Sequence, residues 1–335
     1  MSNQKKDISS KQILTLLYHI DKFISKRKNF DIKDTVLLAG SPRSGTTWLM
    51  ELFESLPEYT YLFEPLQPQW FPNAVNAGFQ GRMYVPKEKN WDEGQKYLEK
   101  IFSGKLVSRL PPYDNINSIM HRLLYKKLIV KSVRITRILP WLLHHIKIRD
   151  AFFIVRHPCA VVSSQIKTGF TGYSHIIPPF NNRNPTINEI VSEAKKIDFI
   201  HDKTLNKLKK LNKIEEVLAV TWCIDNMIPL NEKKPKWSTI FYEKLVLEGE
   251  AELKSLFNRI GEENAYKTAV TKLKEPSVVT YGNDRKLIKS TDMQLSKWKK
   301  SLSEKQIDRI LNVLSIFDFN LYSEEIEPIY ENYQY

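Results

Sequence analysis

A short segment rich in glycine and hydroxyl side chains carries the clearest chemical signal in the sequence. Residues 40–48 read Gly-Ser-Pro-Arg-Ser-Gly-Thr-Thr-Trp and lie between an apolar run that predicts a strand and a helical pattern that begins at Thr46. In such a setting, backbone N–H groups and the helix dipole bind phosphate. The spacing is that of a GxxxxG nucleotide loop, but Thr46 stands where the usual lysine would be, and the cation is Arg43 inside the loop.

The alternative is an ordinary helix start, at which Ser44 or Thr46 caps the first turn. Two glycines, an arginine and a pair of hydroxyl residues each have a separate reason to be present in a phosphate site. The combination therefore favours phosphate binding over a simple cap.

An arginine and a serine eight residues apart form a second candidate pair. Arg156 follows the apolar run 151–155, and Ser164 belongs to a helical pattern that begins near Pro158. Ser164 would then lie nearly two turns into the helix, where its hydroxyl can face the same cleft as Arg156. Taken alone, the pair is more typical of an exposed arginine and a solvated serine. The phosphate loop on the preceding part of the sheet makes a phosphate-binding role the favoured interpretation.

The composition is that of a basic globular protein. The 335 residues include 51 Lys and Arg against 38 Asp and Glu, a formal charge of +13, and 42% are hydrophobic. These values exclude a wholly disordered, collagen-like or coiled-coil chain. Cys159 and Cys223 are too few for a disulfide framework or a four-ligand zinc site, so we expect a reducing, cytoplasmic setting.

The chain is expected to form a single domain, residues 1–335, because no linker-like stretch divides it. Residues 1–33 are expected to be a helical extension. Their apolar stretch, Ile13 to Ile20, is too short to span a bilayer, and no cleavage site follows it. This predicts an amphipathic docking helix and neither a transmembrane segment nor a signal peptide.

Apolar runs that alternate with helical patterns predict the fold class. The expected strands cover residues 35–39, 127–131, 151–155 and 238–242, and the expected helices begin at residue 46 and near residue 158 or cover 138–145, 251–260 and 303–317. Near-continuous apolar strands indicate a parallel sheet that is covered on both faces. The prediction is an α/β protein with a P-loop-like three-layer fold, in which helices flank a central parallel sheet.

Two regions lack this rhythm. Residues 67–117 and 170–185 are rich in proline and polar side chains and do not divide cleanly into elements. Long irregular insertions in a compact α/β protein are usually binding loops or lids, so we expect the acceptor site there. The alternative is a pair of short helices that the pattern does not reveal.

The first motif resembles that of a known family, the sulfotransferases that use 3′-phosphoadenosine 5′-phosphosulfate (PAPS). Their 5′-phosphosulfate loop reads P-[KR]-S-G-T-[TS]-W, and residues 42–48 match every position. The resemblance implies that Arg43 binds the phosphosulfate near its bridging oxygen. It further implies the roles of the five residues that follow: Ser44, Gly45, Thr46 and Thr47 would supply backbone and hydroxyl donors, and Trp48 would pack by the adenine.

Further matches extend the resemblance from about residue 34 to about residue 325. Arg156 and Ser164 correspond to the arginine and serine that bind the 3′-phosphate in this family. Phe-Tyr-Glu-Lys-Leu at residues 241–245 is similar to its YEDL segment, which places Tyr242 near the adenine, and residues 298–302 resemble its W-[KR]-x-x-L segment. Arg285 and Lys286 do not fit the family's RKG motif convincingly and are interpreted as surface charge.

The base that would take the acceptor's proton is suggested by a branch of the same family. Cytosolic members carry a histidine after the strand that matches residues 128–131, but here Lys131 is followed by Ser132 and Val133. Carbohydrate sulfotransferases carry a glutamate in a segment like L-[FY]-E-P, which residues 62–65 match closely, so Glu64 is the candidate base. The alternative is a surface glutamate before a proline turn. Arg43 and, at the same sheet edge, Lys131 would stabilise negative charge, by analogy with phosphoryl transfer.

The leading hypothesis is a sulfotransferase that uses PAPS, without a metal, on a hydroxyl of a carbohydrate or glycolipid acceptor. A P-loop nucleotide kinase is the first alternative, but it would need a lysine at position 46 and a magnesium-binding acid after an apolar strand. The second is a polyanion-binding or nucleic-acid-binding protein, because +13 charges attract any polyanion. The basic residues are spread along the chain and form no nucleic-acid motif, so no nucleic-acid partner is expected.

Overall fold

The computed structural model describes residues 27–106, 123–169, 185–275 and 291–333, together with residue 121 and a few positions between 16 and 24. Most of the expected N-terminal extension, the expected insertion 170–185 except its last residue, residues 107–117 of the other insertion, and Arg285 and Lys286 lie outside the described residues. Within the described part, no helix is long and apolar enough to cross a membrane.

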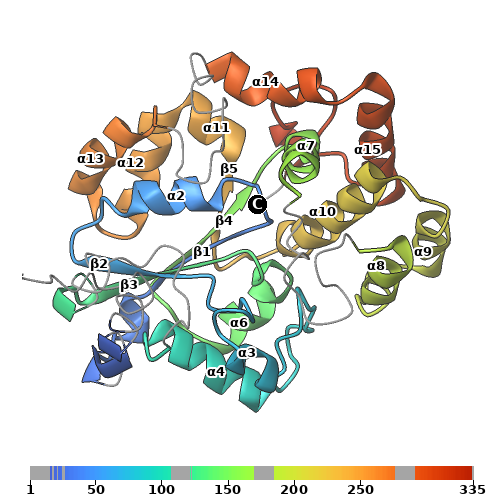
Figure 1. The fold of residues 1–335 in the computed structure, drawn as a ribbon. Coiled ribbons are helices and arrows are strands. Elements are labelled where there is room, and N and C mark those ends of the chain that lie inside the picture. The colour runs from blue at the N-terminus through green and yellow to red at the C-terminus, as the bar shows by residue number, and fades with distance from the viewer. Residues whose placement is uncertain are drawn as a thin grey trace, which may run out of the picture.

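A five-stranded parallel sheet forms the centre of the molecule (Figure 1). Its order is β2-β3-β1-β4-β5, and every neighbouring pair is parallel. The strands are β1 (Val36–Gly40), β2 (Tyr59–Phe63), β3 (Lys127–Ser132), β4 (Asp150–Val155) and β5 (Ser238–Phe241). The predicted α/β fold with a central parallel sheet is confirmed.

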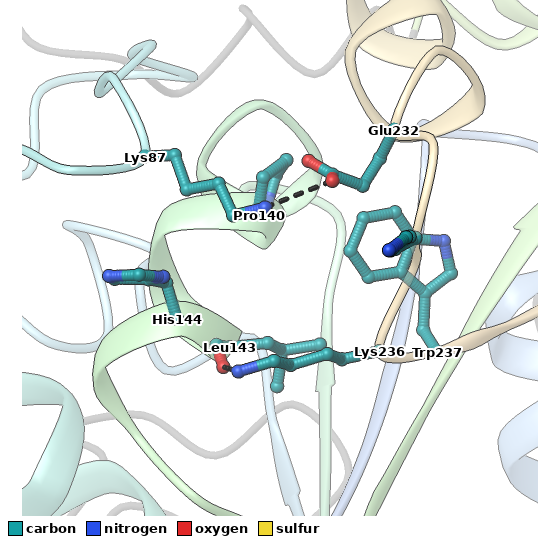
Figure 2. A pocket seen from close by; sticks show the side chains of 8 residues that line it. Lys87, Pro140, Leu143, His144, Glu232, Lys236 and Trp237 are labelled. Carbon is teal, nitrogen blue, oxygen red and sulfur yellow. Dashed lines mark hydrogen bonds and ion pairs between the residues drawn. The ribbon is translucent and has the colours of Figure 1, made fainter.

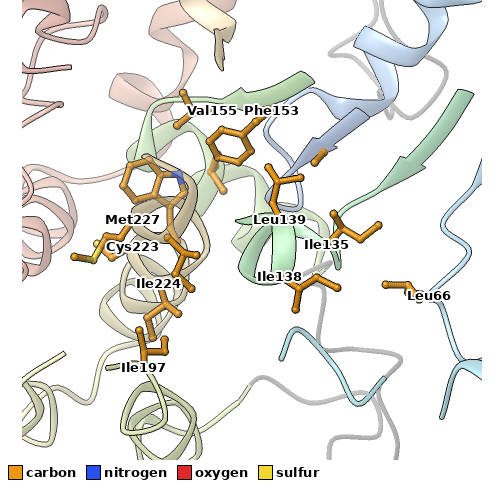
Figure 3. Close-up of a cluster of buried hydrophobic side chains, with 14 of the residues drawn as sticks. Leu66, Ile135, Ile138, Leu139, Phe153, Val155, Ile197, Cys223, Ile224 and Met227 are labelled. Carbon is orange, nitrogen blue, oxygen red and sulfur yellow. The ribbon is translucent and has the colours of Figure 1, made fainter. Parts of the chain in front are cut away.

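Alternate residues of each strand enter two separate cores, one on each face of the sheet. Val36 and Leu38 pack with α2 (Thr46–Phe53), α12 (Gly249–Arg259) and α13 (Tyr266–Lys272). Leu37 and Ala39 pack with the helices of the opposite face: α4 (Asp92–Phe102), α6 (Leu139–His145), α7 (Pro158–Thr168), α10 (Ile214–Leu230) and α15 (Glu304–Ile316). Figure 3 shows part of this second core, to which Phe153 and Val155 of β4 and Cys223 and Met227 of α10 all belong. The result is the predicted three-layer arrangement.

The remaining described elements connect or cover these layers. They are η1 (Ile32–Asp34), α3 (Asn73–Asn76), η2 (Thr136–Ile138), α8 (Ile187–Ala194), α9 (Asp202–Leu208), α11 (Tyr242–Leu247), η3 (Glu263–Ala265), α14 (Thr291–Ser301) and η5 (Tyr330–Asn332).

Part of the region expected to be irregular is regular. Within residues 67–117, residues 73–76 form α3 and residues 92–102 form α4, which matches the alternative of two unrecognised helices. Four side chains of α4 are buried against the sheet and its neighbours: Tyr97, Leu98, Ile101 and Phe102. Helix α4 is therefore a covering helix of the central sheet, and in the described part of the region the irregular residues lie mainly between β2 and α4, on either side of α3.

The strand order places two loops beside each other at the carboxyl edge of the sheet. From β1 the chain crosses over β3 to reach β2, whereas from β4 it continues to β5 on the other side. The connections that leave β1 and β4 thus diverge, and ligands of open α/β sheets bind at such a divergence. Gly40 ends β1 and Arg156 follows β4, so both predicted motifs lie at this position.

Candidate functional site

The loop after β1 is a tight turn that ends at an uncapped helix. A Cβ atom on Gly40 would lie 2.6 Å from the Ile154 carbonyl oxygen, and one on Gly45 would lie 2.7 Å from the Tyr242 ring. Gly45 also has φ of 99°, a left-handed conformation that glycine adopts at little cost. In the described part of the chain, no side chain caps α2 and no acceptor is recorded for the N–H groups of Thr46 and Thr47. These donors remain for an anion.

Two contacts tie this loop to α7. The Nε of Arg43 donates a hydrogen bond to the Ser164 hydroxyl over 2.9 Å, and the Nε2 of Gln165 donates to the Pro42 carbonyl over 3.1 Å. Sequence analysis placed Ser164 with Arg156, whereas here its hydroxyl is bonded to Arg43. Gln165 was not predicted as a site residue, because nothing but its position beside Ser164 marks it.

Arg156 lies on an aromatic surface next to the loop. Its guanidinium carbon is 4.1 Å from the centre of the Tyr242 ring, and its NH1 approaches the Arg43 carbonyl at 3.5 Å. The Tyr242 ring also contacts Trp48, with ring centres 5.4 Å apart, and its hydroxyl accepts a hydrogen bond from Gln294 over 2.7 Å. The fold therefore brings Arg43, Ser164, Arg156, Tyr242 and Trp48 together; Gln294 was missed, since no sequence motif points to it.

The turn that carries Arg156 is fixed by buried polar contacts. Nδ1 of His157 accepts from the Cys159 N–H over 3.1 Å, so its Nε2 donates to the Ser323 carbonyl over 3.0 Å. The ring stacks on Trp298 with centres 4.4 Å apart, and burial lowers the pKa of His157 to about 3. His157 is therefore neutral and structural, while it attaches the C-terminal segment to this turn.

Glu243 supports the same turn from β5's side. Its carboxyl group accepts from the His157 N–H over 2.8 Å and from the Tyr322 hydroxyl over 3.3 Å. Burial raises the pKa of Glu243 to about 7, because the hydrogen bonds offset only part of the desolvation cost.

Glu64 and Lys131 form a buried ion pair at the same edge of the sheet. Glu64 directly follows β2 and Lys131 is the penultimate residue of β3. The Lys131 Nζ lies 2.6 Å from Glu64 Oε1, and the Val133 N–H donates to both carboxylate oxygens at 3.1 Å. Glu64 is 6% exposed and Lys131 3%. Sequence analysis selected both residues separately, and neither their direct contact nor the Val133 bond was predicted.

The backbone at Glu64 has an uncommon conformation. Its φ is 46°, in the left-handed region that non-glycine residues rarely adopt. The Glu64 N–H donates to the Lys131 carbonyl over 2.8 Å, and the Glu64 carbonyl accepts from the Gln67 N–H over 2.9 Å. A tight turn therefore directs the chain away from the sheet immediately after the candidate base.

A small pocket lies elsewhere and contains none of the predicted site residues. Figure 2 shows it between α6 and the segment before β5, where Pro140, Leu143 and Trp237 form its apolar part and Lys87 pairs with Glu232 over 2.9 Å. Trp237 immediately precedes β5, so this pocket belongs to the amino edge of the sheet. Among the described residues, no cluster of three or more His, Cys, Asp or Glu side chains could hold a metal ion.

Comparisons with known proteins give distant structural similarities, including two to sulfotransferase domains. No protein-family model matches the chain, and no curated protein is similar to it in sequence. The structure is similar to the sulfotransferase domain from the curacin biosynthetic pathway, with a TM-score of 0.44 and 16% identity over 88% of this chain and 100% of that one. The sulfotransferase domain from the Synechococcus PCC 7002 olefin synthase has the same TM-score and identity, over 88% of this chain and 97% of its own.

Proposed function

We propose that this protein is a PAPS-dependent sulfotransferase that acts on a hydroxyl group. One observation carries the proposal: Arg43, inside a loop that matches the family's phosphosulfate motif at every position, is bonded to Ser164 and lies against Arg156, the two residues of the second motif. The two motifs are more than a hundred residues apart in sequence and form one cluster beside the strands at which ligand sites of this fold class occur.

The residues present suit a nucleotide with an anionic group at each end. Thr46 and Thr47 retain backbone donors, and the buried hydroxyl of Ser41 has no hydrogen-bond partner in the described residues. With Arg43, Ser44 and Gly45 they would hold the 5′ end. Arg156 and Ser164 would bind the 3′-phosphate, and Tyr242 and Trp48 would form the aromatic surface beside the adenine.

Glu64 and Lys131, the ion pair at the same edge of the sheet, would carry out proton transfer and charge stabilisation. PAPS, when bound, supplies an activated sulfuryl group that leaves the 5′-phosphate as the acceptor oxygen bonds to sulfur. Glu64 would take the proton of the acceptor hydroxyl, and Lys131 and Arg43 would stabilise negative charge that develops on the leaving side. No residue in this scheme requires a metal.

For the acceptor we propose a carbohydrate or glycolipid hydroxyl, as the match around Glu64 implies. The irregular segment that follows Glu64, within residues 67–117, and the segment 170–185 would surround the acceptor as parts of one domain. The turn from Glu64 to Gln67 opens the first of these segments directly at the candidate base.

Calorimetry with adenosine 3′,5′-bisphosphate, with and without a chelator, tests the nucleotide part of the proposal. We expect binding that needs no metal, and Arg43→Ala should weaken it about 10²-fold, since one cation would contact the 5′ group at several oxygens. Arg259→Ala is the matched control, because Arg259 is a surface arginine paired with Asp150 at the start of β4. A preference for ATP with an absolute magnesium requirement would favour the kinase alternative instead. A separate assay of sulfuryl transfer from PAPS to a panel of glycan, lipid and alcohol acceptors tests the chemistry.

A further inference from the structure

Lys131 lies between the two parts of the candidate site. Its backbone pairs in register with Leu38 of β1 on one side and with Phe63 of β2 on the other. Leu38 belongs to the core on the α2 face, and Phe63 packs against the same core. Because in-register neighbours share a face of the sheet, Lys131 lies on the face that α2 covers, one strand away from the loop before α2 and one strand away from Glu64.

In this structure the charged groups of Glu64 and Lys131 bind each other. Lys131 is bonded to one oxygen of Glu64, and Val133 donates to both oxygens. These partners occupy both carboxylate oxygens, one of which would have to receive the proton of the acceptor hydroxyl. Equally, an ammonium group held at 2.6 Å by a carboxylate has little attraction left for an anion in the neighbouring loop.

We propose that Lys131 is a cation shared between Glu64 and the nucleotide: without nucleotide it neutralises Glu64, and an anion bound in the loop after β1 draws it away and frees Glu64 to act as the base. This inference rests on the proposed function, and it adds an order of events to the proposed reaction. The acceptor can be deprotonated only after the donor nucleotide is in place.

The surroundings of the pair allow such an exchange. A buried lysine that left Glu64 for water-free surroundings would pay a large desolvation cost, whereas exchange of one anion for another keeps it paired. The Phe63 ring, 4.4 Å from Nζ, offers a favourable surface for the ammonium group on the flexible lysine stem. Val133 keeps its N–H at Glu64, so the carboxylate stays in position when Lys131 leaves, and its Oε1 atom is then released from the ammonium group.

Competition for one cation predicts the direction in which each substitution changes the affinity for the nucleotide. Glu64→Gln removes the charge that retains Lys131, so it should tighten binding of adenosine 3′,5′-bisphosphate about fivefold or more, within the usual range of coupling between sites. Lys131→Met should weaken binding, and in that background Glu64→Gln should change the dissociation constant less than about twofold, as expected for a cycle without the shared partner. Calorimetry on the full chain measures all four proteins.

The matched control is an ion pair on the same strand. Lys127, four residues before Lys131, pairs with Glu262 at the same distance, 2.6 Å, but at the amino end of β3. Glu262→Gln should leave nucleotide affinity unchanged. Equal tightening by Glu64→Gln with and without Lys131, or none in either case, would overturn the shared-cation proposal, whereas failure of the wild-type protein to bind the nucleotide would refute the proposed function itself.

A second measurement needs no change at Glu64. The amide resonance of Val133 reports on the Glu64 carboxylate, so it should shift when adenosine 3′,5′-bisphosphate binds to the wild-type protein. In Lys131→Met, which has no cation to withdraw, that shift should be absent at saturating nucleotide. The same shift in both proteins would contradict the exchange of partners.

Discussion

The two halves of the carboxyl edge hold their charged groups in opposite ways. Over β2 and β3, a carboxylate and an ammonium group are bonded directly to each other, and they also contact the Val133 N–H and the Phe63 ring. Over β4 and β5, Arg156 rests on an aromatic ring, and its turn is fixed by a neutral histidine, by Glu243 and by the C-terminal segment. The first half can exchange partners, whereas the second is built to stay as it is.

This difference matches the division of labour in the proposed reaction. Binding of a 3′-phosphate requires a cation in a fixed place, because misplacement weakens charge-assisted hydrogen bonds steeply. Proton transfer requires a base within hydrogen-bond reach of the acceptor hydroxyl, and in the proposed reaction that base, Glu64, exchanges its counter-ion when the nucleotide binds. Variants of Glu64 in the first half should therefore have their largest effect on turnover, and variants in the second half should alter stability or binding.

The largest effect is expected at Glu64. Glu64→Gln keeps the shape of the side chain but removes the basic group, so turnover with a verified acceptor should fall roughly 10² to 10⁴-fold, the usual contribution of general-base catalysis. Nucleotide binding should not weaken. Steady-state kinetics together with calorimetry check this, and near-normal turnover would place the base elsewhere, with the segment 67–117 as the next candidate.

The second effect is on stability and depends on pH. The pKa of Glu243 is raised by burial from 4.5 to about 7, so the folded protein favours the protonated carboxyl group. Its contribution is fully present below pH 4.5 and is lost as the pH rises through 7, a change of about 3 kcal/mol. Glu243→Gln, which mimics the protonated form, should therefore gain stability over the wild-type protein across this window.

Unfolding by urea at several pH values between 4 and 8 measures that difference. The lowered pKa of His157 acts in the opposite direction, because its contribution is lost as the pH falls from 6.5 toward 3. Both proteins retain His157, so its effect largely cancels in the comparison. Parallel stability curves for the two proteins would show that Glu243 does not titrate in this range.

The third and smallest effect is selective weakening of binding at Arg156. Arg156→Ala should weaken adenosine 3′,5′-bisphosphate roughly 10 to 100-fold, the contribution of one or two charge-assisted hydrogen bonds, while adenosine 5′-monophosphate binds nearly as before. Calorimetry with the two ligands gives the ratio. Equal losses of affinity for both ligands would show that Arg156 does not bind the 3′-phosphate. They would also contradict the assignment of the second half of the edge to 3′-phosphate binding.

The parts of the fold that sequence could predict are those with an unambiguous pattern. The strands β1, β3, β4 and β5 are short apolar runs with clear ends, and each was found within two residues of its position. The edge strand β2 was not predicted, because Tyr59–Phe63 mixes aromatic, polar and aliphatic residues. Helix α10 was not predicted either. Nearly all its residues are buried, so it has no polar face to reveal the helical period.

For the candidate site, sequence predicted the residues better than their partners. The motif around Arg43 and the strand ends at Lys131 and Arg156 follow from local spacing. The bonds from Arg43 to Ser164 and from Lys131 to Glu64 join different strands and helices, and local spacing carries no information about them. They depend on the sheet order β2-β3-β1-β4-β5, which emerges only when the whole chain has packed.

The hydrogen bond from His157 to Ser323 has a consequence for folding while the chain is being synthesised. That bond spans 166 residues, and the bond from Arg43 to Ser164 spans 121. At ~5–20 residues per second, a ribosome needs roughly 10 to 30 s after it has made His157 before the partner of that side chain exists. The turn that carries Arg156 thus stays incomplete on the nascent chain, and we expect the site to be among the last parts of the molecule to reach its native form.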